Sequence, residues 1–402
     1  MNNELLTITK YDLLGKLPDP FLTESGKRIS DPAEWSARRA EIAKSAIELQ
    51  YGKMLPEPEF VEVETLYVAE KICGYLIHTG TKERPLCFRM QVLLPSREDK
   101  TRPFPVIVDG DQCWMYHMDR AFLNAALDQG IGWVFFDRTE LAPDLNRRGR
   151  QNGAVYRTYP DSDVGVLGAW AWGYSRCVDA LEQIDLPIDL DWIAFSGHSR
   201  GGKTAALAGA LDQRARIVNP NATCAGACGC YRIHMEGEYE NGQTGRSETL
   251  KDLWNVFSFW MGPRMGEYAE REAELPFDTH FLKAMVAPRT LFISEAAGDF
   301  WANPVGSWQT TMAAKEVFKF LGAEENLFWY FRPGTHAHAV SDVEMLVNII
   351  RHQRDGKPLD ERFFQLPFSE LPLAFDWKAP DRERHSSFAA GQQENPLSAP
   401  LR

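Results

Sequence analysis

A serine flanked by glycines is the strongest chemical signal in the sequence. The residues Gly197-His198-Ser199-Arg200-Gly201 match the pattern G-x-S-x-G, with an apolar run before them and a helix-forming Ala/Leu run after them. At a sharp turn from strand to helix, small residues two before and two after the serine avoid a clash and leave its hydroxyl exposed. We therefore predict Ser199 as a nucleophile and the backbone amide of Arg200 as an oxyanion-hole donor. A glycine-rich turn without chemistry is the alternative.

Two later loops carry the base and the acid that a serine nucleophile needs. Asp299 follows the apolar run 290–294, and His336 follows the apolar run 327–331. In α/β-hydrolases the serine comes first along the chain, the acid second and the histidine last. We predict His336 as the base that takes the proton of Ser199, and Asp299 as the acid that orients this base.

Other residues compete for these roles. His338 is a second candidate base, because it lies two residues after His336. Glu295 is a second candidate acid, although it directly abuts the preceding apolar run. The H-x-H pair could be half of a metal site, but no other His, Asp or Glu cluster with ligand spacing completes it. The three thiols within 224–230 could also bind a metal, but such thiols more often fill small spaces near a strand end. We therefore predict no metal and no cofactor.

The elements that must position these residues follow from hydrophobic patterning. From residue 105 onward, short apolar runs alternate with helical stretches, which is typical of a parallel sheet buried on both faces. The expected strands begin at residues 105, 133, 192, 216, 290 and 327. The expected helices span about 31–51, 119–128, 163–184, 201–212, 310–321 and 341–353. The pattern predicts an α/β fold, with a mostly parallel central sheet flanked by helices.

The rest of the chain falls into three expected parts. Residues 1–55 are a helical N-terminal lead-in. Residues 56–355 are a single α/β-hydrolase catalytic domain, which opens with antiparallel strands in 60–95. An insert at about 222–285 interrupts the alternation, and we expect it over the C-terminal ends of the strands, where ligands bind. Residues 356–402 form an extended tail rich in Pro and charge.

Composition limits the possible partners. The chain has 402 residues, of which 44% are hydrophobic and 25% charged, as in ordinary globular proteins. Its net charge of −12 argues against nucleic acid or an anionic membrane surface as partner, and no run approaches the ~20 apolar residues of a membrane span. The N-terminus has no secretory pattern, and the seven cysteines are scattered. We therefore expect a cytoplasmic protein, from a bacterium; the oligomeric state is not set by the sequence.

The residues of the predicted site also resemble a known family. The stretch 197–203 resembles the G-x-S-R-x-G-K motif of the glucuronoyl esterases, carbohydrate esterase family 15. The likeness continues through the acid loop 294–304 and the histidine loop 332–336. Many members carry Cys where this chain has His198, so that family's disulfide is absent here. Some members place the acid one strand earlier, but residues 218–223 contain no carboxylate, which favours Asp299.

The resemblance implies an activity and a set of sugar contacts. The family cleaves esters of 4-O-methylglucuronic acid, the bonds that join xylan to lignin alcohols. By resemblance, Arg200 holds the oxyanion with its side chain as well as its amide, Lys203 reaches the sugar hydroxyls, and Trp301 stacks along the sugar ring. Gln243 and Glu248 fall where the family often places further sugar contacts. For a cytosolic enzyme, the expected substrates are imported oligosaccharides or small esters.

Two other functions fit the same residues. One is an esterase of the same fold that acts on acetyl or other small carboxylic esters. The other is a hydrolase-like protein that has lost catalysis and only binds carbohydrate. The intact set of Ser199, Asp299 and His336 argues against the second of these.

Overall fold

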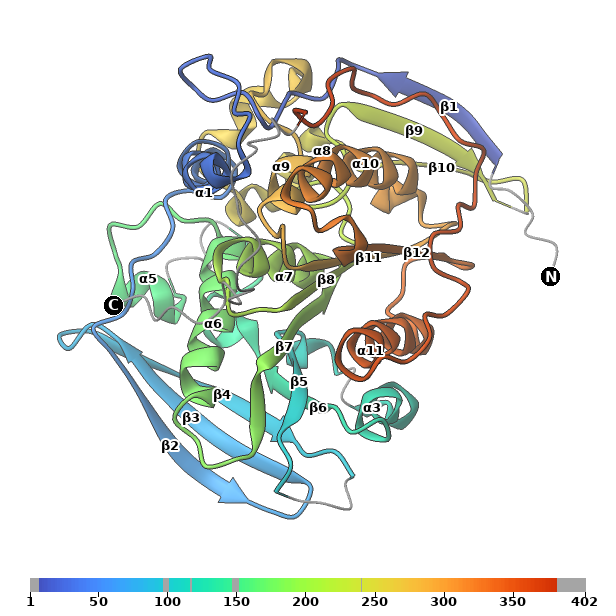
Figure 1. Ribbon diagram of the computed structural model, residues 1–402. Coiled ribbons are helices and arrows are strands. Elements are labelled where there is room, and N and C mark those ends of the chain that lie inside the picture. Colours follow the sequence, from blue (N-terminus) through green and yellow to red (C-terminus); the bar gives the residue numbers. More distant parts are fainter. Residues whose placement is uncertain (1–6, 97–100, 116–117, 147–151, 240, 382–402) are drawn as a thin grey trace, which may run out of the picture.

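A nine-stranded sheet forms the centre of the computed structural model (Figure 1). The structure describes residues 7–96, 101–115, 118–146, 152–239 and 241–381. The strand order is β12-β11-β8-β7-β5-β6-β4-β3-β2. The six strands from β12 to β6 are parallel, and β4, β3 and β2 continue the sheet in antiparallel fashion. The prediction of a mostly parallel sheet flanked by helices is confirmed.

The parallel strands are the apolar runs of the sequence. They are β5 (Phe104–Asp109), β6 (Gly132–Phe136), β7 (Ile188–His198), β8 (Ile217–Asn221), β11 (Thr290–Ala296) and β12 (Leu327–Arg332). In β5, β6 and β11 every residue is buried, because both faces of these strands are covered. The antiparallel strands are β2 (Phe60–Val68), β3 (Ile72–Gly80) and β4 (Pro85–Leu93). Side chains of β4 alternate between buried and exposed, as predicted for 60–95.

Helices cover both faces of the sheet (Figure 1). One face carries α6 (Val166–Leu181), α7 (Arg200–Leu211), α9 (His280–Ala284) and α10 (Pro304–Leu321). The other face carries α3 (Arg120–Leu127) and α11 (Val340–Asp355). The predicted helices are present, although α10 begins six residues before the predicted start at 310, because Asn303 caps it and Pro304 occupies its first position.

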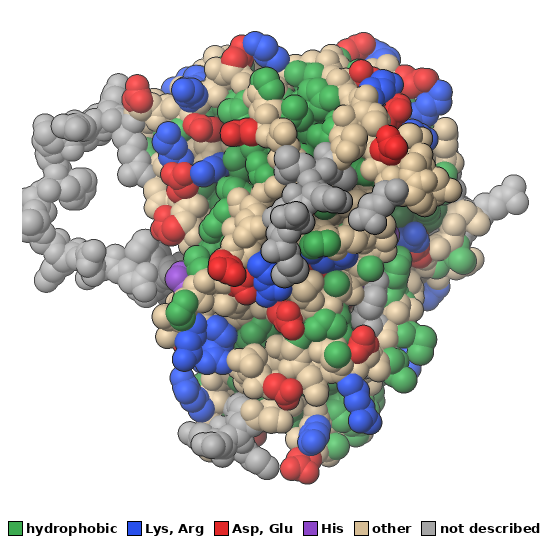
Figure 2. Space-filling model, turned by 90° about the vertical axis from the view of Figure 1, so that its right-hand side faces the viewer, with side chains coloured by type: hydrophobic (Ala, Val, Ile, Leu, Met, Phe, Trp, Pro, Cys, Tyr) green, Lys and Arg blue, Asp and Glu red, His purple; other side chains and the backbone are tan. Residues whose placement is uncertain are grey.

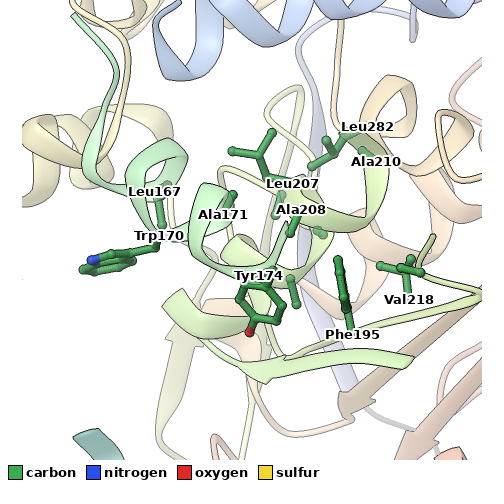
Figure 3. Close-up of a cluster of buried hydrophobic side chains, with 14 of the residues drawn as sticks. Leu167, Trp170, Ala171, Tyr174, Phe195, Leu207, Ala208, Ala210, Val218 and Leu282 are labelled. Carbon is green, nitrogen blue, oxygen red and sulfur yellow. The ribbon is translucent and has the colours of Figure 1, made fainter. Parts of the chain in front are cut away.

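The tightest apolar packing lies between α6, α7 and the strands beneath them (Figure 3). The ring of Tyr174 on α6 lies 5.0 Å from that of Phe195 on β7, measured between centroids. Leu207 of α7 and Val218 of β8 belong to the same cluster, and all four side chains are fully buried. Burying one large apolar side chain stabilises the fold by about 1.5–3 kcal/mol. This packing fixes β7 and α7 relative to each other, and therefore fixes the turn between them.

A second, smaller sheet was not predicted. Strand β1 (Thr7–Leu13) pairs antiparallel with β9 (Ile233–Glu238), which also pairs with β10 (Thr244–Arg246). The lead-in thus contains a strand as well as helix. Its helical part is nearly continuous, as η1 (Pro32–Glu34), α1 (Trp35–Ile42), η2 (Ala43–Ile47) and α2 (Glu48–Tyr51).

The predicted insert and tail both pack against the main sheet layers. The insert contributes β9, β10 and α8 (Leu250–Phe257), and α9 also falls within it. The described part of the tail has no helix or strand, yet its side chains Phe363, Phe368 and Phe375 are buried in the body of the protein. Residues 382–402 lie outside the described residues. The division into lead-in, catalytic domain and tail remains a prediction.

The surface carries both signs of charge. Figure 2 shows acidic and basic side chains interspersed across one face, so the net charge of −12 is not gathered into a single acidic patch on that face. Among the described helices, none combines the length and the apolar character that a bilayer span requires.

One buried ion pair lies just past the C-terminal ends of β5 and β6. Arg138 Nη1 donates to the carboxylate of Asp111, and both side chains are inaccessible to solvent. Asp111 Oδ2 also accepts from the amide of His198 at 2.7 Å. A charge removed from water is tolerated only when a partner compensates it. The ion pair therefore joins the segments that follow β6 and β5, and the amide bond joins the segment that follows β5 to the end of β7.

We expect Arg138→Ala to lower the free energy of unfolding by about 3–5 kcal/mol, because it leaves Asp111 buried without its cation. Urea unfolding followed by tryptophan fluorescence measures this loss. Arg89→Ala is the matched control, since Arg89 pairs with Glu140 while its side chain is 68% exposed. That control is expected to lose only about 0–1 kcal/mol, and equal losses in the two variants would contradict the prediction.

Candidate active site

Ser199 occupies the turn between β7 and α7 in a strained backbone conformation. Its φ is 56° and its ψ is −119°, a combination that side-chain-bearing residues rarely adopt and that costs about 1–3 kcal/mol. The Ser199 amide donates to Asn221 O at 2.8 Å, and Ser199 O accepts from the Lys203 amide at 2.9 Å. These bonds hold the turn, which presents the Ser199 side chain at the N-terminus of α7.

The two glycines of the motif are required by close contacts. A Cβ on Gly197 would lie 2.5 Å from Gly201 O. A Cβ on Gly201 would collide with the carboxylate of Asp111. The turn can close only because both positions lack a side chain.

The structure brings the predicted base and acid to Ser199. His336 Nε2 lies 3.0 Å from Ser199 Oγ, and His336 Nδ1 lies 2.6 Å from Asp299 Oδ2. Asp299 is an acceptor, so the imidazole proton sits on Nδ1 and the lone pair of Nε2 faces the hydroxyl. Asp299 is 3% exposed, whereas the His336 side chain is 37% exposed and therefore open to a ligand. This geometry suits proton abstraction from a serine hydroxyl.

The alternative base and acid make other contacts. The His338 ring stacks on His198 and lies edge-on to Phe122. Glu295 is fully buried, and its Oε1 accepts from Ser307 Oγ at 3.0 Å. Burial raises the pKa of Glu295 to about 8, and the nearby Asp299 carboxylate adds to the rise. The contact that orients His336 therefore comes from Asp299.

The Arg200 guanidinium is held by a carboxylate and surrounded by aromatic rings. Its Nη1 donates to Asp144 Oδ2 at 2.6 Å, and Trp260 Nε1 donates to the other oxygen of Asp144 at 2.9 Å. The guanidinium carbon lies 4.8 to 5.4 Å from the ring centroids of Trp260, Phe257 and Trp114. The Arg200 amide belongs to the first turn of α7, whose N–H groups the helix itself does not use.

Sequence reasoning missed Asp144 and the three rings around Arg200. They come from three separate segments, and no local pattern links them. The only available signal was the expected position of the insert, which carries Phe257 and Trp260, over the strand ends.

Lys203 and Glu248 form a buried pair. Lys203 Nζ donates to Thr223 O, to Ala225 O at 2.6 Å and to Glu248 Oε2 at 3.4 Å. Both side chains are less than 5% exposed, and burial raises the pKa of Glu248. The three donors of the Lys203 ammonium are thus directed at protein oxygens, and its contact with a sugar remains a prediction.

Trp301 lies on the acid loop itself, whereas Gln243 lies before β10. Trp301 follows Asp299 in the short helix η9 (Phe300–Ala302) and is 41% exposed, with the Arg246 guanidinium 5.4 Å from its ring centroid. Its carbonyl accepts from the Glu248 amide at 3.1 Å. Gln243 lies exposed before β10, and its side-chain oxygen accepts from Asn241 at 3.3 Å. Trp301 is therefore a partly exposed aromatic ring beside the acid, with Arg246 over the ring.

No metal centre is formed by the part of the chain that the structure describes, since it contains no group of three His, Cys, Asp or Glu side chains suited to an ion. All seven cysteines are free.

A serine at a strand-to-helix turn of a parallel sheet, with an acid and a histidine on later strand ends, defines the α/β-hydrolase class of serine hydrolases. A family model described as "Glucuronyl esterase, fungi" matches residues 77–322, which is more than half of the chain. The chain belongs to the glucuronoyl esterase family, carbohydrate esterase family 15, whose members are carboxylic ester hydrolases.

Relatives and solved structures agree with this assignment. A 4-O-methyl-glucuronoyl methylesterase of Podospora anserina is 29% identical over 326 residues, which cover 80% of this chain but only 64% of that protein. The enzyme of the same name from Hypocrea jecorina is 28% identical over 375 residues, covering 91% of this chain and 76% of that protein. A family 15 glucuronoyl esterase from Caldicellulosiruptor kristjansonii superposes with a TM-score of 0.80 at 29% identity, covering 91% of this chain and 98% of that one.

The prediction of a cytoplasmic bacterial protein is wrong. The curated relatives come from fungi such as Podospora anserina, Hypocrea jecorina and Cerrena unicolor, which points away from it. The prediction rested on the first residues of the chain and on the scattered thiols. Five of the seven cysteines are buried, where a thiol acts as a small apolar side chain and carries no information about the redox compartment.

We expect Asp299→Asn to lower kcat by about 10⁴-fold, because an amide at this position favours the wrong imidazole tautomer. Glu295→Gln is the matched control, since Glu295 contacts Ser307 rather than His336. The control should keep kcat within about threefold. Steady-state hydrolysis of a glucuronate methyl ester measures both, and the opposite ranking would assign the acid to Glu295.

The raised pKa of Glu295 predicts a specific pH dependence of stability. Between its ordinary value of 4.5 and about 8, the folded state keeps a proton that the unfolded state has lost. Stability therefore falls as pH rises through this window. Relative to wild type, Glu295→Gln should gain up to about 1.4 kcal/mol per pH unit there. Urea unfolding at several pH values tests this, and a constant difference between the two proteins would refute it.

Proposed function

We propose that the chain hydrolyses 4-O-methylglucuronoyl esters through an acyl-enzyme on Ser199. The observation that carries the proposal is the contact of His336 with Ser199 Oγ at 3.0 Å and with Asp299 at 2.6 Å. The substrate class is supported by the relatives named 4-O-methyl-glucuronoyl methylesterase. It is further supported by a structurally similar esterase of Sporotrichum thermophile (TM-score 0.72, 23% identity), solved in complex with methyl 4-O-methyl-β-D-glucopyranuronate.

In the first step, Ser199 Oγ attacks the ester carbonyl carbon while its proton passes to His336 Nε2. The resulting imidazolium is stabilised by Asp299, which accepts from Nδ1. Negative charge develops on the carbonyl oxygen beside the Arg200 amide at the N-terminus of α7, with the guanidinium of Arg200 nearby. One well-placed oxyanion donor lowers the barrier by about 3 kcal/mol.

Collapse of the first tetrahedral intermediate breaks the bond to the alcohol, which leaves with the proton from His336, and the acyl-enzyme is complete. Water then attacks the acyl-enzyme, and His336 again takes a proton as the new carbon–oxygen bond forms. Collapse of the second tetrahedral intermediate breaks the bond to Ser199 Oγ, which recovers its proton from His336. The products are the alcohol and a glucuronate carboxylate, and the enzyme is regenerated.

Sugar recognition falls to the residues around the acid loop. Trp301 is a partly exposed aromatic ring next to the acid, and stacking on aromatic side chains is a common way to bind an organic ring. Lys203 and Glu248 form a buried polar pair that is joined to the loop through the Glu248 amide and Trp301 O, and Gln243 lies exposed before β10. We propose these four residues as the sugar contacts.

We expect Ser199→Ala to lower the hydrolysis of benzyl and methyl esters of glucuronic acid by at least about 10⁴-fold, because the acyl-enzyme forms on the Ser199 hydroxyl. Initial rates on these esters and on acetylated xylo-oligosaccharides are compared in wild type and variant. Faster turnover of the acetyl esters would favour the alternative esterase.

A fluorophosphonate probe separates an enzyme from a protein that only binds carbohydrate. Wild type should be labelled at one site, and Ser199→Ala should not be labelled. Retained ester turnover in Ser199→Ala, or an unlabelled wild type, would overturn the proposal.

A further inference from the structure

Three imidazole rings lie in a row between the nucleophile turn and the histidine loop. The ring centroids of His336 and His198 are 4.7 Å apart, and those of His198 and His338 are 5.4 Å apart. His198 and His338 are stacked, with an interplanar angle of 14°. His198 precedes Ser199 in the chain, and His338 lies on the loop that carries His336. The row therefore joins the segments that hold the nucleophile and the base, although these residues are 137 positions apart.

His198 is fixed in one orientation by the end of β8. Its Nδ1 lies 2.5 Å from Asn221 Oδ1. The Asn221 amide nitrogen donates to Ser294 O at 3.2 Å and to Ser294 Oγ at 2.8 Å. A carbonyl can only accept, so the amide nitrogen must face Ser294 and the amide oxygen must face His198. Nδ1 of His198 is therefore the donor, and rotation of its ring would break this bond.

His338 closes the row on the opposite side. Its ring lies edge-on to Phe122 of α3, with centroids 4.7 Å apart and an interplanar angle of 75°. The side chains of His198 and His338 are both buried. Burial lowers the pKa of His198 to about 3 and that of His338 well below its usual value. His336 thus faces a neutral aromatic ring rather than a second positive charge.

Other contacts on the histidine loop hold its backbone. Arg332 donates to the carbonyls of Pro333 at 3.1 Å and Thr335 at 3.2 Å, and its Nε donates to Asp342 at 3.0 Å. No disulfide links this loop to the nucleophile turn, because every cysteine is free. Side-chain contacts across the gap include the bond from Ser199 to His336 and the packed imidazole rings.

We propose that His198 and His338 are positioning residues, and that their stacked rings hold the His336 imidazole in place against Ser199. The proposal rests on the proposed function, in which His336 is the base. His338 acts through His198, whose ring lies against His336. Without the flat ring of His338, the stacking contact between His198 and the histidine loop is lost. The His336 imidazole, which lies against His198, is then free to shift.

We expect His338→Leu to lower kcat by about 10- to 100-fold while KM stays within about twofold, because a misplaced base slows the chemistry without removing a substrate contact. His338→Phe should restore kcat to within about threefold of wild type, since it keeps a flat ring for His198 and Phe122. Rates are expressed per site titrated with the fluorophosphonate, so that an unfolded fraction does not enter kcat. His78→Ala is the control, because His78 lies exposed on β3 and pairs with Glu64; it should leave kcat unchanged.

Three results would overturn the proposal. The first is a wild-type kcat in His338→Leu. The second is an equal loss in the Leu and Phe variants, which would indicate a need for the imidazole nitrogens. The third is a loss confined to KM. In each case an inactive Ser199→Ala would leave the esterase mechanism standing, so the two proposals fail separately.

Discussion

The hydrogen bond between Ser199 Oγ and His336 Nε2 is the contact on which the function of the rest of the structure depends. It spans 3.0 Å between residues 137 positions apart, so every element between them must be held in place. Ser199 adds a strained backbone with φ of 56°, which persists only where the surroundings over-determine it. The apolar packing of α6 and α7 on β7 and β8 provides this rigidity (Figure 3).

Stability and function draw on different parts of the same sheet. The middle of the parallel strands is covered by apolar side chains on both faces, and this burial stabilises the fold. The C-terminal ends of the strands carry buried polar groups instead, such as Asp111, Asn221, Ser294 and Glu295. Each is hydrogen-bonded to a neighbouring segment. Buried polar groups destabilise a fold unless they are paired. Their concentration around Ser199 is therefore a departure from the apolar-core pattern of the kind that functional sites show.

Parts of the fold and of the site could be predicted from sequence, because they depend on short stretches of neighbouring residues. Continuous apolar runs predicted the parallel strands, the G-x-S-x-G motif predicted Ser199, and the order of serine, acid and histidine along the chain predicted Asp299 and His336. The pairing of β1 with β9, the contact of Asp144 with Arg200 and the stack of His198 on His338 could not be predicted. Each joins segments far apart in the chain, and only the assembled fold sets their distance. The compartment was missed for another reason, since buried thiols pack in the same way in any compartment.

Lys203 shows why a matching motif does not by itself define what a side chain does. The sequence places it four residues after the nucleophile, where the family resemblance implies a sugar contact. In the structure its ammonium reaches the carbonyls of Thr223 and Ala225 and the carboxylate of Glu248. It therefore fastens the segment that follows β8 to the helix that begins at Ser199. Because Glu248 in turn donates its amide to Trp301 O, Lys203 also connects that helix to the acid loop. The contacts of Lys203 thus support the arrangement of Ser199 and Asp299 without a bound ligand.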